Sequence, residues 1–354
     1  FGQELLPPDL DRGAKHIQAG MDRVPVFAEV GVKSVVCGPT SRTTDLNGLM
    51  GPICGLRNFF VLAGFSSGVA QGAGAGQQLA EWIVAGEPSL DLRELDVNRY
   101  GAFANQRYVR AMLVEKHSVG TIDPTVEREA GRPAKTGPLY HRLKDRGAEF
   151  GARYGWECPL WFWPRGSAKT ARGGSRRPPW FGPVARECRA LRQRAAILDR
   201  CGISLFEVCG PNSQPFLDRL CANALPERRG EAAASPMLTE GGGIQCLMTV
   251  ARLGPDRFRL SGPVEAERHH LAWLSAHAGG GVAIENLTGR CAALLVAGPA
   301  AAGVLSSLSG TDLTDRAFPP GSVRGMDLGY APVIALRLDD LGVPAWEIHL
   351  PVEY

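Results

Sequence analysis

The sequence lacks several features that would place it in a broad class at once. Its 354 residues contain no run of 18 apolar residues, so it predicts no membrane-spanning helix. Its formal net charge is only +3, which predicts neither a nucleic-acid partner nor attachment to a membrane surface. It shows no internal repeat and no basic-then-apolar secretion signal. Its composition is that of an ordinary globular protein, and its length predicts two or three domains.

Metal-binding patterns are also missing. The nine cysteines include no Cys-x-x-Cys pair, and no histidine lies at metal-finger spacing from them. We therefore expect reduced, mostly buried thiols in a reducing compartment. His269 and His270 are adjacent, and neighbouring residues on a helix point to different faces. The sequence favours two solvent-facing histidines here, and it predicts no metal site.

The most informative segment is residues 58–86. A short apolar strand at 59–63 leads into a loop of Gly, Ser and Ala, and an amphipathic helix is expected at 77–84. A small-residue turn before a helix N-terminus allows a backbone to approach a flat or anionic ligand closely. The nearest match to the dinucleotide fingerprint G-x-G-x-x-G begins at Gly72, but its third glycine position is Gln77. The segment therefore does not predict a complete dinucleotide site.

The composition of the chain changes at residues 165–178, which are rich in Gly, Ser and Arg and are expected to form an exposed linker. Before this segment the pattern is α/β. After it, strands and helices alternate in a way that predicts an α+β domain with largely antiparallel sheets. The Trp-rich stretch at 155–163 is expected to pack one domain against another rather than to form a stacking platform. Helices are predicted at 9–30, 106–115, 139–150, 183–196, 213–220, 265–278 and 299–308, and further strands at 31–37, 202–208, 244–253, 258–261, 282–287 and 292–297.

A set of short motifs follows in order along nearly the whole chain. They are Gly38-Pro39, Gly55-Leu56-Arg57-Asn58-Phe59-Phe60-Val61, Leu79-Ala80-Glu81-Trp82-Ile83, Gly155-Trp156-Glu157, Phe206-Glu207-Val208, Met237-Leu238-Thr239-Glu240 and Trp346-Glu347-Ile348-His349-Leu350-Pro351. Together they resemble the dimethylglycine and sarcosine dehydrogenase family. Its members are flavoproteins with an oxidoreductase part, a central connecting domain and a C-terminal part shaped like the glycine-cleavage T-protein, an aminomethyltransferase.

The resemblance implies a division into three parts and a chain truncated at both ends. Residues 1–103 would be the C-terminal part of an FAD-dependent oxidoreductase domain, and residues 104–165 the central connecting domain. Residues 178–354 would be a C-terminally incomplete, folate-binding T-protein-like domain. The expected fold is thus an α/β segment followed by an α+β domain.

The resemblance implies that this chain contains only half of a flavin-binding site. The residues that would line the flavin ring or lie close behind it are Gly64, Phe65, Ser66, Ser67, Gly68, Val69, Gly74 and Gly76. The alternative is a plain tight connection between a strand and a helix. The family's pyrophosphate-binding turn would lie upstream of Phe1, so we expect this half alone to hold FAD weakly.

For tetrahydrofolate, the resemblance implies a degraded site. The family places an Asp three residues after Gly-Gly-Ile for proton handling, and this sequence has Leu247, which cannot accept a proton. Ala234 and Asp340 stand where the family has aromatic hydroxyl residues. Only Glu347 remains of this set, and its alternative interpretation is an exposed strand carboxylate. No catalytic residue is predicted.

Two functions from different classes remain open. The resemblance implies a flavin-dependent N-methyl amine oxidoreductase coupled to folate one-carbon transfer, with a small methylated amine as substrate and this chain as a partial or degenerate member. The alternative is a non-catalytic regulatory protein similar to the regulatory subunit of pyruvate dehydrogenase phosphatase. In that case Leu247 and Ala234 would pack in the core. Either reading places the protein in the cytoplasm or the mitochondrial matrix.

Overall fold

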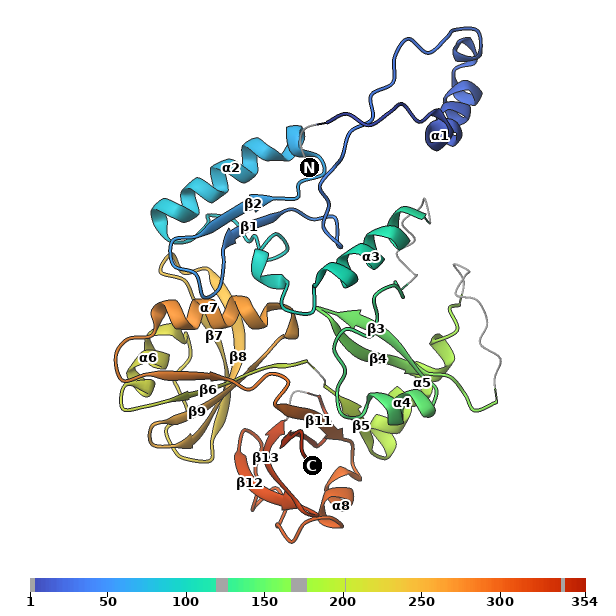
Figure 1. Cartoon of the computed structure of the whole chain (residues 1–354). Coiled ribbons are helices and arrows are strands. Elements are labelled where there is room, and N and C mark those ends of the chain that lie inside the picture. The colour runs from blue at the N-terminus through green and yellow to red at the C-terminus, as the bar shows by residue number, and fades with distance from the viewer. Residues whose placement is uncertain (1–3, 119–126, 167–176, 201, 339–340) are drawn as a thin grey trace.

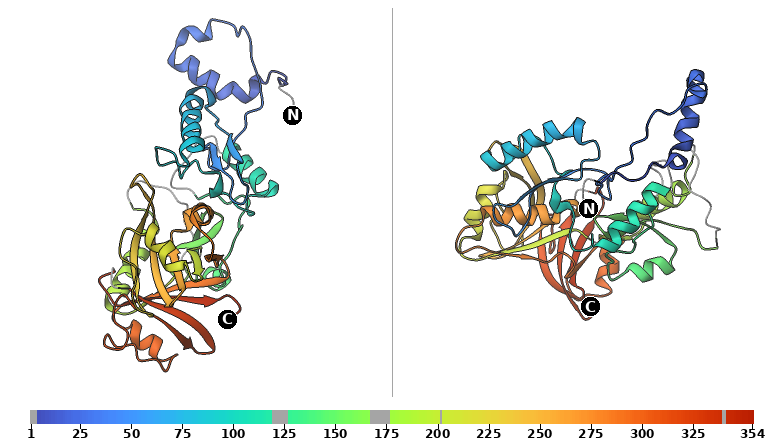
Figure 2. Two further views of the ribbon diagram at one scale, coloured as in Figure 1. Left: turned by 90° about the vertical axis from the view of Figure 1, so that its left-hand side faces the viewer. Right: turned by 45° about the horizontal axis from the view of Figure 1, so that its top comes forward.

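The computed structural model describes residues 4–118, 127–166, 177–200, 202–338 and 341–354. Its N-terminal part consists of α1 (Leu10–Arg23), the 3-10 turn η1 (Pro25–Ala28), β1 (Leu49–Pro52), β2 (Phe60–Ala63), α2 (Gly68–Ala85) and the 3-10 turn η2 (Val97–Arg99). Strands β1 and β2 form an antiparallel hairpin, and α2 runs beside it (Figure 1). Helix α1 buries no residue and projects away from the rest of the molecule (Figure 2).

The middle of the chain forms a small two-stranded unit. It contains α3 (Gln106–Ser118), α4 (Tyr140–Asp145), β3 (Ala148–Arg153), β4 (Trp156–Phe162) and α5 (Phe181–Gln193). Trp156 is buried, and a β-carbon added at Gly202 or Gly289 of the C-terminal part would lie 2.7 Å or 3.3 Å from its indole ring. The Trp-rich strand therefore packs against the C-terminal part, which confirms the predicted role of that stretch.

Two five-stranded antiparallel sheets make up the C-terminal part (Figures 1 and 2). The first has the order β10-β6-β9-β8-β7 and the second the order β12-β13-β14-β11-β5. The strands are β5 (Ala196–Asp199), β6 (Ser204–Cys209), β7 (Ala232–Leu238), β8 (Ile244–Gly254), β9 (Arg257–Gly262), β10 (Ala283–Asn286), β11 (Cys291–Ala297), β12 (Val323–Leu328), β13 (Ala331–Leu338) and β14 (Ala345–Pro351). The helical elements are α6 (Ser213–Leu220), the 3-10 turn η3 (Val264–Ala266), α7 (Glu267–His277) and α8 (Ala301–Ser306). The predicted α+β class with antiparallel sheets is confirmed.

Each sheet has its own core. Alternate residues of the first sheet meet helices α6 and α7, with Phe206, Met248 and Phe258 fully buried. The second sheet buries Phe318 and Trp346 beside α8. Burial of each such side chain contributes about 1.5–3 kcal/mol, so the C-terminal part has ample apolar area for a stable fold. A smaller cluster of buried side chains joins the two sheets at Ala251, Val323 and Leu336.

Four predicted elements differ clearly from the structure. The helix predicted at 9–30 ends at Arg23, and a 3-10 turn follows it. Residues 31–36 form no strand, and only Cys37 makes an isolated bridge, with Leu6. The helix predicted at 139–150 ends at Asp145, because Gly147 takes a positive φ of 87° and turns the chain into β3. Helix α2 begins at Gly68, nine residues before the predicted start at 77.

Other sequence expectations have mixed outcomes. All eight cysteines in the described part of the chain are free thiols, but only Cys246 is buried, so the expected burial was wrong for most of them. No helix among the residues that the structure describes is long and apolar enough to cross a membrane. Residues 167–176 of the expected linker, and Asp340, lie outside the described residues. The three-part division of the chain stays a prediction.

Candidate functional site

The predicted flavin segment begins where β2 ends. Gly64 has a positive φ of 73°, and a β-carbon added there would lie 3.0 Å from Cγ2 of Thr43. The position therefore needs glycine for both its backbone angle and its packing. The Phe65 ring covers Gly48, where an added β-carbon would come within 2.4 Å of the ring. Phe65 is thus a packing residue of this turn, and Ser66 and Ser67 lead directly into α2.

Gly68, Gly74 and Gly76 lie within α2 and not in a loop, so the predicted loop was wrong for these residues. Gly74 and Gly76 lie beyond the first helical turn. Their backbone N–H groups bond within the helix and are therefore unable to donate to a ligand. A β-carbon added at Gly68, Gly72, Gly74 or Gly76 would meet no atom within 4 Å, and Val69 is fully exposed. This face of α2 is therefore open to solvent, and it does not suit phosphate binding along the helix.

Glu347 lies in β14 with only 4% of its surface exposed, so the interpretation as an exposed strand carboxylate was wrong. His349 Nε2 donates to Glu347 Oε1 at 2.9 Å, and Arg200 Nη1 lies 3.2 Å from Oε2. Burial alone would raise the pKa of Glu347, but the hydrogen bond and charge of His349, the charge of Arg200 and a hydrogen bond from Ser261 together lower it. Glu347 is therefore an ionised carboxylate whose oxygens are already engaged by side chains of the protein.

The other two folate positions in the described part of the chain lie on the hairpin of β7 and β8. Leu247 is 57% exposed and Ala234 is also exposed, so the expectation of core packing for these two was wrong. Neither offers a proton acceptor. Because Leu247 is apolar and Glu347 is engaged elsewhere, the residues present do not fit the proton transfer that one-carbon chemistry on folate requires.

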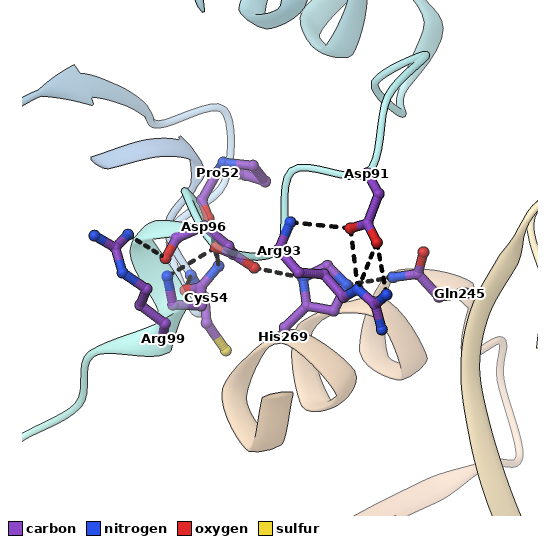
Figure 3. Close-up of polar contacts among 9 residues, drawn as sticks. Pro52, Cys54, Asp91, Arg93, Asp96, Arg99, Gln245 and His269 are labelled. Carbon is purple, nitrogen blue, oxygen red and sulfur yellow. Dashed lines mark hydrogen bonds and ion pairs between the residues drawn. The ribbon is translucent and has the colours of Figure 1, made fainter. Parts of the chain in front are cut away.

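A polar junction joins the N-terminal and C-terminal parts, and no motif in the sequence indicated it (Figure 3). Asp96, from η2, is buried and accepts a hydrogen bond from Nδ1 of His269 on α7. Nε2 of His269 contacts the amide nitrogen of Gln245 on β8. Beside this series of hydrogen bonds, Arg93 Nη2 donates to Asp91 Oδ2 at 2.6 Å. The expectation that both histidines of the 269–270 pair face solvent was wrong.

The signal for this junction was weak because Asp96 and His269 are 173 positions apart. Next to it, His270 is 1% exposed, and burial, as the largest cause, lowers its pKa to about 3. His270 is therefore a neutral core residue. Adjacent residues on a helix point in different directions, and the sequence does not show what each of them meets. In the fold, His269 and His270 both face other parts of the protein.

A cavity of about 310 Å³ lies next to the junction. Arg99 is buried and donates from Nε to Asp45 Oδ2 at 2.6 Å and from Nη1 to the Asp96 carbonyl at 3.0 Å. Burial opposes ionisation of Asp45, but the hydrogen bond and charge of Arg99 outweigh it and lower the pKa of Asp45. The cavity is lined by Thr44, Asp45, Asn47, Glu94, Arg99, Tyr100, Phe103, Tyr108, Met112, Ala152, Tyr154 and Gly155.

Comparison with known proteins identifies a family for this chain. Residues 139–354 match the protein family described as the GCVT N-terminal domain. The chain is 35% identical to the mitochondrial dimethylglycine dehydrogenase of Rattus norvegicus over 99% of its own length. The chain belongs to the GCVT family, and it is similar to dimethylglycine and sarcosine dehydrogenases. It is also 30% identical to the mitochondrial sarcosine dehydrogenase of Homo sapiens, again over 99% of its length.

Another similar protein is named as a regulatory subunit rather than as an enzyme. The chain is 31% identical to the mitochondrial pyruvate dehydrogenase phosphatase regulatory subunit of Mus musculus over 99% of its length. It spans only 41–43% of the length of these three relatives. The glycine cleavage system aminomethyltransferase T from Bartonella henselae superposes with a TM-score of 0.50 at 26% identity, covering 62% of this chain and 54% of that one. The aminomethyltransferase-like fold expected from the sequence is thereby confirmed.

Proposed function

We propose that this chain is a portion of a flavin-dependent N-methyl amine oxidoreductase that carries a folate-type aminomethyltransferase-like domain. The observation that carries the proposal is the similarity to the dehydrogenases over 99% of the chain, across both the N-terminal α/β segment and the GCVT domain. The substrate would be a small methylated amine. The compartment would be the mitochondrial matrix or the bacterial cytoplasm, in keeping with the free thiols of the described residues.

The flavin part of the proposal is supported by the open face of α2. Its glycines leave the helix backbone accessible, and Val69 is in solvent. FAD would lie with its ring against this face, and no phosphate-binding turn accompanies it in this sequence. We therefore expect the chain to purify without colour and to lose added FAD on desalting. Retention of a near-stoichiometric flavin spectrum would show that the phosphate-binding turn is not needed.

The folate part of the proposal is supported by the aminomethyltransferase-like fold and by the accessibility of the hairpin that carries Leu247. We expect weak binding of tetrahydrofolate and no one-carbon transfer. Leu247→Asp would add a charge-assisted hydrogen bond worth about 1.5 kcal/mol, which is roughly a tenfold gain in affinity.

Calorimetric titration with tetrahydrofolate tests this placement. Ile244→Asp is the matched control, because Ile244 is an exposed apolar residue at the start of the same strand. The proposal predicts a gain for Leu247→Asp and none for Ile244→Asp. Equal affinities for the wild-type chain and Leu247→Asp would show that residue 247 does not face the folate.

The second candidate is a non-catalytic regulatory protein. Two observations favour it: the 31% identity to the phosphatase regulatory subunit, and the engagement of Glu347 by Arg200 and His349. The same titration separates the two candidates. Binding that Leu247→Asp strengthens supports the folate-linked protein. Absence of heat with both the wild-type chain and Leu247→Asp favours the regulatory one.

A further inference from the structure

The first half of β8 is held by the sheet on one side only. Strand β8 pairs with β7 along nearly its whole length, but it pairs with β9 only from Thr249 onward. The register also shifts between Met237 and Leu238, so that Gln245 has no directly opposite residue in β7. A bulge of this kind bends the strand and turns a side chain in a new direction. Within the sheet, residues 244–248 are therefore held by β7 alone, and contacts outside the sheet add to their position.

The side chain of Gln245 supplies such a contact. Its amide nitrogen meets Nε2 of His269, and Nδ1 of His269 meets Oδ2 of Asp96 (Figure 3). Both ring nitrogens are thus engaged. The neutral imidazole with its proton on Nδ1 satisfies both contacts, because Nδ1–H donates to the carboxylate and Nε2 accepts from the amide.

Asp96 is itself firmly held in the N-terminal part. Its Oδ1 accepts from the backbone and side-chain nitrogens of Asn98 at 2.8 Å and 2.9 Å. Asn98 in turn donates to the Pro52 carbonyl at the end of β1, and Met50 of β1 donates to the Leu95 carbonyl, both at 2.8 Å. A continuous series of hydrogen bonds therefore runs from β1 through η2 and α7 to the bulge in β8.

We propose that His269 is a positioning residue that fixes the first half of β8, and with it Leu247, relative to the N-terminal part. The hairpin of β7 and β8 would then follow any displacement of η2, and η2 would respond to a ligand on the hairpin. The proposal rests on the proposed function only in taking the ligand of the hairpin to be a folate.

Amide hydrogen exchange on the whole chain tests the link without any ligand. His269→Phe keeps the ring volume and removes both contacts, Asp96→Asn keeps the Oδ1 acceptor for Asn98, and Gln245→Met keeps the side-chain length. Each variant should raise exchange at residues 244–248 by roughly threefold to tenfold, which corresponds to a coupling of about 0.6–1.4 kcal/mol. Residues 249–251, which β7 and β9 hold from both sides, should keep their wild-type protection.

His277→Phe is the matched control, because His277 lies on the same helix and its Nδ1 contacts the carbonyl of Trp273 within that helix. It should leave exchange at 244–248 unchanged. The proposal is overturned if Gln245→Met and His269→Phe leave that exchange at the wild-type level. It is equally overturned if Asp96→Asn changes exchange only around η2.

A folate titration then shows whether the link matters for binding. With 5-formyl-tetrahydrofolate as the stable probe, Asp96→Asn should weaken binding by a similar factor although Asp96 lies in the other part of the molecule. Unchanged affinity together with raised exchange would overturn the coupling to the ligand. If the wild-type chain binds no folate, the proposed function fails, and the exchange result still decides whether His269 positions β8.

Discussion

His270 should make the stability of this protein fall steeply below neutral pH. The side chain is 1% exposed, its Nδ1 has no hydrogen-bond partner among the described residues, and burial lowers its pKa to about 3 from an ordinary value of 6.5. The unfolded chain therefore binds a proton before the folded one does. The stability that the neutral imidazole contributes is complete above about pH 6.5 and is lost as the pH falls from 6.5 toward 3.

The size of the effect at pH 5 depends only on the unfolded value, because the folded pKa lies well below 5. A difference of 1.5 pH units from 6.5 corresponds to about 2 kcal/mol at 1.36 kcal/mol per unit. His270→Leu removes the titrating group and leaves an apolar side chain in the same buried position. The free energy of unfolding, measured by urea denaturation at pH 7.5 and pH 5.0, should therefore fall by about 2 kcal/mol less in His270→Leu than in the wild-type chain.

The comparison cancels the titration of all other groups, because both chains share them. Identical pH dependence in wild-type and His270→Leu chains would refute the reasoning. It would mean that His270 is protonated in the folded protein, and that a solvent path or an anionic partner reaches its ring.

Three further changes have clear expected results. Glu207→Ala leaves the buried Arg259 unpaired and should lower the free energy of unfolding by about 3–5 kcal/mol in urea denaturation, whereas a loss under 1 kcal/mol would contradict the pairing. Gly72→Ala should raise the melting temperature and stabilise α2 by up to about 1 kcal/mol, because its added methyl group meets no atom, and a lower melting temperature would show that this face is covered. Cys188 should react with a thiol reagent first, and Cys246, whose pKa burial raises to about 12, only on unfolding; equal rates would contradict this order.

The sequence predicted part of the C-terminal sheets. Strands β6, β8, β9, β10 and β11 were expected, whereas β5, β7, β12 and β13 were not. In β8 the residues Cys246, Met248 and Val250 are buried at every second position. Strand β6 is buried on both faces, so its residues do not alternate. Fold class and family both followed from patterns within short segments. These are the features that local chemistry determines most strongly, since each strand must place one face toward its core.

The start of α2 was missed because glycine disfavours helices by about 1 kcal/mol per residue relative to alanine. Packing outweighs that cost here. Trp82 lies over Gly51 of β1, where an added β-carbon would come within 2.7 Å of the indole ring, and Ala75 and Gln78 are buried on the inner side. Contacts with a hairpin thus keep a glycine-rich segment helical, and no local pattern reports such contacts.

Local sequence patterns also failed to predict the polar contacts of the candidate site. The contacts of Asp96 with His269, and of Arg200 with Glu347, each join residues more than 140 positions apart, and neither pair forms a motif. The family resemblance named Glu347 but could not show that a cation already engages it. Burial of a carboxylate requires such partners, because an unpaired buried charge costs several kcal/mol.

The apolar Leu247 and the engaged carboxylate of Glu347 support one conclusion although they lie on different sheets. A single missing carboxylate at 247 could be restored by substitution, and that change should strengthen binding. Transfer would still fail, because His349 engages Oε1 of Glu347 and Arg200 lies beside Oε2, so Glu347 would have to release both before it could contact a ligand. Folate affinity and one-carbon transfer are therefore separable in this chain, and Leu247→Asp should recover the first without the second.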